Sequence, residues 1–119
     1  LKARRHEAIC RAFSHAGKPY DFEFDFFSTD KIVCTELVFR AYDGAVSFPL
    51  VDVLGRKTYP AIEMVKKFAV ERGTVGAQLD FIAFAQLNED TGQVQFRDEE
   101  IFAKTIEIPG LDFLQGLLE

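Results

Sequence analysis

The sequence predicts an α+β fold in which helices pack on a small antiparallel sheet. Apolar residues recur at helical spacing in several stretches, and stretches rich in β-favouring residues lie between them. The chain has 119 residues, which is long enough for one domain with a hydrophobic core and too short for two. We therefore expect residues 1–119 to form a single domain.

Composition and charge exclude several classes of protein. Apolar residues make up 48% of the chain and charged residues 28%, as in ordinary globular proteins. The formal net charge is −5, and no basic stripe is present to neutralise phosphates, so no nucleic-acid partner is expected. No apolar run is long enough to span a bilayer, so no transmembrane segment is expected. The 13 phenylalanines and the absence of tryptophan predict a core built on aromatic packing.

The chain is expected to begin with a helix from Lys2 to about Ala16, because apolar residues follow one another there at helical spacing. Gly17 is a natural residue to end it. From Tyr20 to Phe26 the pattern alternates, which predicts a half-buried strand. Its phenylalanines would share one face and its acidic residues the other. The two sets are Phe22, Phe24 and Phe26, and Asp21, Glu23 and Asp25.

A second helix is predicted after the turn and N-cap residues Ser28, Thr29 and Asp30. Its apolar stripe reaches Tyr42, and Gly44 closes it. Cys34 lies near the beginning of this helix. Unpaired backbone N–H groups and the positive end of the helix dipole stabilise an anion at such a position, which favours the reactive thiolate.

The rest of the chain is predicted as a series of short elements. Residues 45–58 are interpreted as a loop with one short extended piece, because Pro49 and Gly55 interrupt them. The following elements are expected in order: a helix opened by Thr58, Tyr59 and Pro60 and ended by Gly73; a strand over residues 79–87; a hairpin loop over 88–92; a return strand over 93–97; a helical turn over 98–104; an extended piece over 106–108; and an apolar tail, Leu111–Leu118, docked on the body.

Two cysteines, Cys10 and Cys34, are too few for a disulfide framework, and no clustered Cys/His spacing indicates zinc. Glycine motifs that bind phosphate are also absent from the sequence, so we expect no metal and no cofactor. Cys10 lies among apolar residues and is interpreted as a small buried hydrophobe. On its own, Cys34 would be interpreted in the same way, as a buried inert thiol.

The residues around Cys34 change that interpretation. The segments Gly17-Lys-Pro-Tyr20, Phe24-Asp25, Cys34-Thr-Glu-Leu-Val38 and Ala41-Tyr42 resemble the NlpC-like branch of papain-fold cysteine hydrolases. More narrowly, they resemble its circularly permuted members of the YiiX/YaeF type, which read G-x-x-Y-D and then C-[ST]-E-L-V. The resemblance covers residues 12–43 well. It implies that Cys34 is the nucleophile, that Tyr20 and Asp21 line or support the site, and that Glu36 is a signature residue.

A nucleophilic cysteine needs a base, normally histidine. The chain contains His6 and His15, both on the first predicted helix, and no histidine follows Cys34. His15 is one candidate base. The other interpretation places the base in sequence before Leu1, so that this chain is the C-terminal portion of a longer permuted papain-like domain. It would then contact that segment or a second chain.

The predicted function is that of a thiol hydrolase or acyltransferase that acts through Cys34 on an amide or ester. The resemblance implies either a cell-wall peptide or a lipid acyl substrate, and the permuted branch leans toward lipids. The alternative is a non-catalytic papain-like binding module whose catalytic histidine is absent. For location, the bacterial cell envelope and the cytoplasm both stay open.

Overall fold

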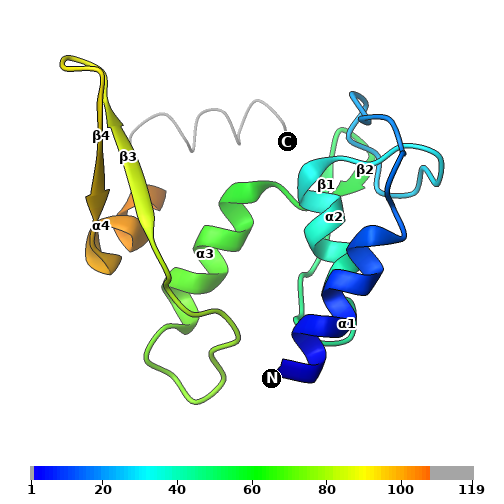
Figure 1. The fold of residues 1–119 in the computed structure, drawn as a ribbon, viewed down its shortest axis with the longest axis horizontal. Coiled ribbons are helices and arrows are strands. Elements are labelled where there is room, and N and C mark those ends of the chain that lie inside the picture. Colours follow the sequence, from blue (N-terminus) through cyan, green and yellow to red (C-terminus); the bar gives the residue numbers. More distant parts are fainter. Residues whose placement is uncertain (1, 108–119) are drawn as a thin grey trace. The chain divides into compact units, whose positions relative to one another are not determined.

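The computed structural model describes residues 2–107, and the expected apolar tail Leu111–Leu118 lies outside them. Helices alternate with two small antiparallel hairpins, which confirms the α+β class (Figure 1). The elements are α1 (Lys2–Phe13), α2 (Cys34–Ala41), β1 (Val51–Val53), β2 (Arg56–Thr58), α3 (Ala61–Glu71), β3 (Phe84–Asn88), β4 (Gln93–Arg97), α4 (Glu99–Lys104) and a 3₁₀ helix (Thr105–Glu107).

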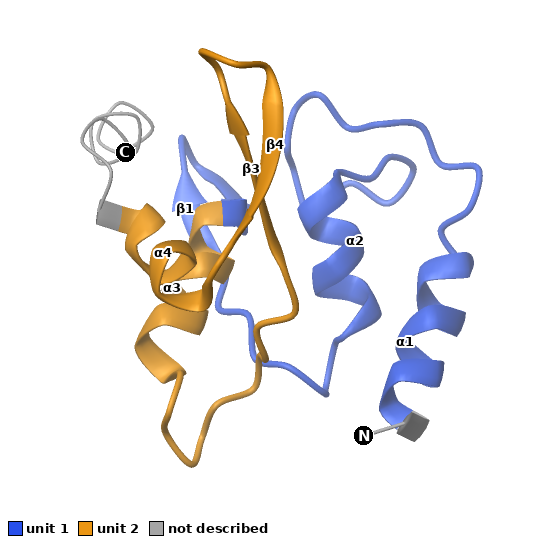
Figure 2. Ribbon diagram, turned by 60° about the vertical axis from the view of Figure 1, so that its left-hand side comes forward, with its two compact units in different colours: residues 1–61, 116–119 blue, residues 62–115 orange. Residues whose placement is uncertain are grey.

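The chain divides into two compact units, coloured separately in Figure 2. Unit 1 contains the described residues up to Ala61, with α1, α2 and the β1–β2 hairpin. Unit 2 contains those from Ile62 on, with nearly all of α3, the β3–β4 hairpin and α4. The organisation of residues 1–119 as a single domain stays a prediction.

The first helix is confirmed, although it ends at Phe13 and not near Ala16, and the interpretation of Cys10 as a buried side chain is wrong. In α1 the side chain of Ala8 is buried, whereas Ile9, Cys10 and Phe13 are exposed. Successive residues of an α-helix are turned by about 100° from one another. A narrow contact centred on Ala8 therefore leaves the larger apolar side chains beside it in solvent. Cys10 is not a buried hydrophobe, since its Sγ lies 3.7 Å from His6 Nε2 on the exposed face.

The predicted strand from Tyr20 to Phe26 is wrong. One isolated parallel bridge joins Tyr20 to Ile32, and the residues that follow form turns. The Asp21 side chain accepts hydrogen bonds from the backbone N–H groups of Glu23 and Asp25, at 2.9 and 3.0 Å. These backbone donors therefore bind a side chain and not a neighbouring strand. Asp21 is fully buried, on the side that the alternation assigns to solvent.

The stretch predicted as a loop before α3 contains a hairpin. Strands β1 and β2 pair antiparallel, with Val53 opposite Arg56. Leu54 and Gly55 form the two-residue turn, and both have positive φ, 52° and 78°. This is the geometry of a type I′ turn, which normally contains Asn-Gly. Thr58 belongs to β2, so the following helix begins later than predicted, at Ala61.

Unit 2 is built around aromatic rings, as the composition predicts. Phe102 of α4 lies 5.4 Å from Phe68 of α3, 5.8 Å from Phe81 and 5.3 Å from Phe84, measured between ring centroids. The predicted hairpin is confirmed, with Phe84 opposite Arg97 and Asn88 opposite Gln93, although its first strand begins only at Phe84.

The last predicted elements of the described chain have mixed outcomes. The helical turn is confirmed as α4, and the Asp98 side chain caps it by accepting the N–H of Ile101 at 2.9 Å. The extended piece that was expected next is wrong for Ile106 and Glu107, which belong to the 3₁₀ helix, and Ile108 lies outside the described residues.

Candidate functional site

Cys34 is the first residue of α2, and its side chain is exposed. Val33 before it is buried and extended, with φ −98° and ψ 156°, so the chain enters the helix at a fixed angle. The thiol therefore lies beside the unpaired N–H groups of the first turn, as predicted. The interpretation of Cys34 as a buried residue is therefore wrong, while its reactivity stays a prediction.

The N-cap was expected among Ser28, Thr29 and Asp30, and this is also wrong, because Val33 holds that position. The Ser28 hydroxyl donates to Asp30 Oδ1 at 2.8 Å, and this bond lowers the pKa of Asp30. These two polar side chains therefore satisfy one another inside the preceding loop.

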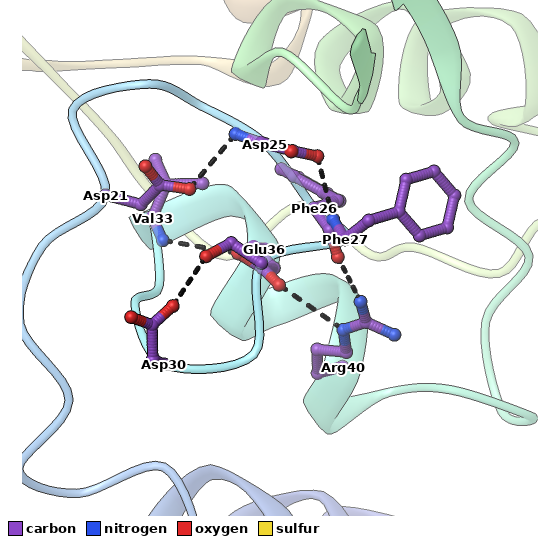
Figure 3. A network of polar contacts seen from close by, with 9 residues as sticks. Asp21, Asp25, Phe26, Phe27, Asp30, Val33, Glu36 and Arg40 are labelled. Carbon is purple, nitrogen blue, oxygen red and sulfur yellow. Dashed lines mark hydrogen bonds and ion pairs between the residues drawn. The ribbon is translucent and has the colours of Figure 1, made fainter.

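The buried side chain of Glu36 stabilises the first turn of α2 (Figure 3). Its carboxylate is buried, and Oε2 accepts the backbone N–H of Val33 at 3.5 Å, while Oε1 lies 3.5 Å from Arg40 Nε. Burial raises the pKa of Glu36, while the Val33 N–H and the Arg40 guanidinium oppose that shift and the nearby Asp21 adds to it. Glu36 therefore positions Val33, the residue that precedes Cys34.

Arg40 and Asp21 attach the loop before α2 to the same network (Figure 3). The Arg40 guanidinium donates to the Phe26 carbonyl, and the Phe26 ring lies 5.7 Å from that of Phe39. Asp21 binds two backbone N–H groups of this loop, and Asp25 Oδ1 accepts the N–H of Phe27 at 3.0 Å. Asp21 thus acts on the backbone of the loop.

A pocket of about 560 Å³ opens beside Cys34, with all its walls in unit 1. The loop before α2, the start of α2, the β1–β2 hairpin and the residues just after it contribute to it, and most of these side chains are apolar. Its lining residues are Glu23, Phe24, Val33, Cys34, Thr35, Val53, Leu54, Arg56, Thr58, Pro60 and Ala61. Sequence reasoning missed the hairpin wall, because a leucine at the first position of the turn hides the usual turn signal.

Tyr20 lies behind one wall of this pocket. Its ring packs edge-on against Phe22 at 4.9 Å and against Phe24 at 6.2 Å, and Phe24 lines the pocket. The bridge to Ile32 holds Tyr20 beside the segment that leads into α2. Tyr20 therefore supports a wall through Phe24, and it is not itself among the lining residues.

Neither histidine is hydrogen-bonded to Cys34 in the part of the chain that the structure describes. His6 pairs with Cys10. His15 is half-buried and its Nδ1 has no hydrogen-bond partner within residues 2–107; partial burial, Lys18 and Arg40 lower its pKa. Arg40 follows Cys34 by six residues, which is about 9 Å along a helix axis. The electrostatic neighbour of His15 therefore lies at the opposite end of α2 from the thiol.

Other kinds of site find no support in the described ranges. Within residues 2–107, no group of three or more His, Cys, Asp or Glu side chains is placed to hold a metal ion. The helices of this same part of the chain are all too short or too polar to cross a membrane.

An exposed thiol at the first residue of a helix, beside an apolar pocket, is typical of nucleophilic cysteines. The family described as "Permuted papain-like amidase enzyme, YaeF/YiiX, C92 family" matches residues 1–89 of the 119. The chain belongs to this family, which confirms the resemblance found around Cys34. The family also supports the predicted class of protein, a cysteine hydrolase. No curated protein and no solved structure matches the chain significantly.

Proposed function

We propose that Cys34 is the nucleophile of a thiol hydrolase or acyltransferase that acts on an amide or ester. The observation that carries this proposal is the exposure of Cys34 at the first residue of α2 while it lines the pocket. Its thiolate attacks the carbonyl carbon, and the tetrahedral intermediate collapses to a thioester as the amine or alcohol leaves with a proton. Water, or another acceptor in a transfer reaction, then attacks the thioester and frees the thiol.

The developing oxyanion needs hydrogen-bond donors in fixed positions. The backbone N–H of Cys34 has no partner within the helix, because the first four N–H groups of any α-helix lack one. Glu36 and the buried Val33 hold that turn in place. This N–H is therefore our candidate oxyanion donor.

The base that takes the thiol proton is proposed to come from outside residues 2–107. His6 is paired with Cys10, and the charged neighbours of His15 are Lys18 and Arg40. The sequence contains no other histidine. A histidine from another segment or from a second chain, packed against the start of α2, would complete the site.

The test compares two cysteine-to-serine variants of the full-length protein. Cys34→Ser should lower kcat/KM for p-nitrophenyl esters and anilides by at least about 10³-fold, because the attacking atom is lost. Circular dichroism should show an unchanged fold. Cys10→Ser removes the other exposed thiol and should leave kcat/KM unchanged. Full activity in Cys34→Ser, or its loss in Cys10→Ser alone, would contradict the assignment.

A non-catalytic binding module is the second candidate. The observation that favours it is that no described histidine is hydrogen-bonded to Cys34. In that case the full-length protein binds acyl compounds in the pocket and releases no product from any of the esters or anilides above.

A further inference from the structure

We propose that Phe24 and Leu54 are the residues that set the acyl specificity of the Cys34 pocket, which takes an apolar acyl chain. This inference rests on the proposed function of Cys34 and adds the residues that select the acyl group. Three observations carry it: the backbone conformation of the two residues, the exposure of their side chains, and the contacts that hold the two walls together.

The first observation is backbone strain at two separate places in one pocket. Phe24 and Leu54 have φ of 55° and 52°, and they are the non-glycine residues of the described chain with positive φ. Bulky side chains rarely adopt this conformation, and glycine or asparagine would adopt it more readily. The two residues lie on different loops, yet both line the pocket beside Cys34. Strain of this kind is concentrated at ligand-binding and catalytic sites.

The second observation is that neither side chain serves the core. Phe24 is 49% exposed and Leu54 is 74% exposed, whereas Phe26, in the same loop as Phe24, is fully buried against Phe39. A turn residue chosen for stability alone would be Asn before Gly55. The fold therefore gains little from Leu54, while the pocket gains an apolar wall.

The third observation is that the two walls are tied together. Arg56, next to the hairpin turn, donates from Nη1 to the Glu23 carbonyl at 2.5 Å. The Phe26 N–H donates to the Lys57 carbonyl at 3.3 Å. These contacts join β2 to the loop on both sides of Phe24, so the two apolar side chains keep a fixed separation.

The lining chemistry identifies the occupant. Val33, Val53 and Pro60 extend the apolar surface that Phe24 and Leu54 begin, and Cys34 lines the same pocket. A carbonyl carbon at Cys34 would therefore have an apolar chain in the pocket, since apolar surface removed from water is the main gain available there. The lining also includes Glu23, Thr35, Arg56 and Thr58, but a polar peptide acyl group would leave the apolar walls unused.

The first experiment uses Leu54→Asn in the full-length protein. Asn-Gly is the preferred sequence of a type I′ turn, so Tm should rise by about 2–5 °C. The ratio of kcat/KM for p-nitrophenyl octanoate to that for p-nitrophenyl acetate should fall roughly tenfold, because the apolar wall is lost. Leu87→Asn, at an exposed leucine in β3, is the matched control and should leave both Tm and the ratio near the wild-type values.

The second experiment does not depend on turnover. Octanoate binding to the Cys34→Ser protein, measured by calorimetry, should weaken roughly tenfold when Leu54→Asn is added. Phe24→Asn, at the other positive-φ position, should weaken it similarly and serves if the first variant fails to fold. If the wild type shows no turnover while this binding persists, the proposed function fails and the pocket assignment stands. Unchanged octanoate affinity in both variants, or faster hydrolysis of alanyl than of octanoyl anilides, would overturn the inference.

Discussion

The two units have interiors of different kinds. Among the described residues, the buried polar and charged side chains are Asp21, Glu36 and Thr58, and all three lie in unit 1. In unit 2 the buried side chains among the described residues are Phe68 and Ala103, and the Phe68 ring contacts those of Phe81 and Phe102. Unit 1 also contains Cys34 and its pocket.

This difference separates two uses of a buried side chain. Burying a carboxylate costs free energy unless hydrogen bonds replace the lost water. The carboxylates of Asp21 and Glu36 accept hydrogen bonds from backbone N–H groups of the loop and turn that lead to Cys34. Aromatic packing fixes no donor or acceptor, so the rings of unit 2 stabilise without orienting a reactive group. Substitutions of buried residues in unit 1 should therefore mainly change the geometry around Cys34. Substitutions of buried residues in unit 2 should mainly lower the free energy of unfolding.

The largest expected effect is in unit 2. Phe68→Ala should lower the free energy of unfolding by about 3–5 kcal/mol, because it leaves a cavity among the remaining rings. The measurement is urea denaturation followed by circular dichroism. Phe96→Ala, at an exposed phenylalanine of β4, is the matched control and should change stability by less than about 0.5 kcal/mol. Equal effects at the two positions would refute the assignment of the cluster as the interior of unit 2.

In unit 1, substitution of Asp21 is expected to cost less stability than Phe68→Ala does but to disturb the loop beside Cys34 more. Asp21→Ala leaves the N–H groups of Glu23 and Asp25 without their acceptor and should cost about 2–3 kcal/mol. Iodoacetamide should then label Cys34 at a different rate, because the loop beside it loosens. The control is Asp43→Ala, at an exposed aspartate after α2. An unaltered labelling rate in a destabilised Asp21→Ala protein would show that Asp21 has no influence on the site.

The smallest effect is a difference in pH dependence between the units. Burial raises the pKa of Glu36 above 4.5, so the folded state binds its proton more tightly, and the stability contributed is lost as pH rises through that folded pKa. Glu36→Gln does not titrate there, so its stability relative to wild type should improve as pH rises above 4.5.

Glu100 in unit 2 provides the opposite case. Its pKa is lowered by Arg72, which donates to it at 2.9 and 3.1 Å, so its contribution to stability is present above 4.5 and lost as pH falls. Glu100→Gln should therefore become less stable relative to wild type as pH rises toward 4.5. The measurement is the urea midpoint of wild type and of both variants at pH values below and above 4.5. If the stability of the two variants relative to wild type changed with pH in the same direction, the prediction would be contradicted.

The predictions that the structure confirmed depend on neighbours along the chain. The beginning of α2 near Cys34, the Asn88–Gly92 turn and the helical turn that became α4 are such cases. In the Asn88 turn, the Asn88 side chain accepts the N–H of Asp90 at 3.0 Å, a contact between residues two apart. Local hydrogen bonds of this kind are encoded in short stretches of sequence.

The alternation from Tyr20 to Phe26 misled for a related reason. Period two predicts which residues share a face only if the backbone is a strand. Here Asp21 turns the chain by binding its own neighbours, and Phe24 adopts positive φ. The buried member of each alternating set is thus a single residue, Phe26 in one and Asp21 in the other.

By itself, then, the sequence determined the α+β class, the family and the position of Cys34 at a helix start, since each depends on residues close together in the chain. Only the tertiary structure decided that Cys34 is exposed and has a pocket beside it. Phe24 and Leu54 both line the pocket, and the hydrogen bond from Arg56 to the Glu23 carbonyl joins the two segments that carry them. Contacts across thirty-odd residues depend on how whole segments pack, and no local pattern specifies them.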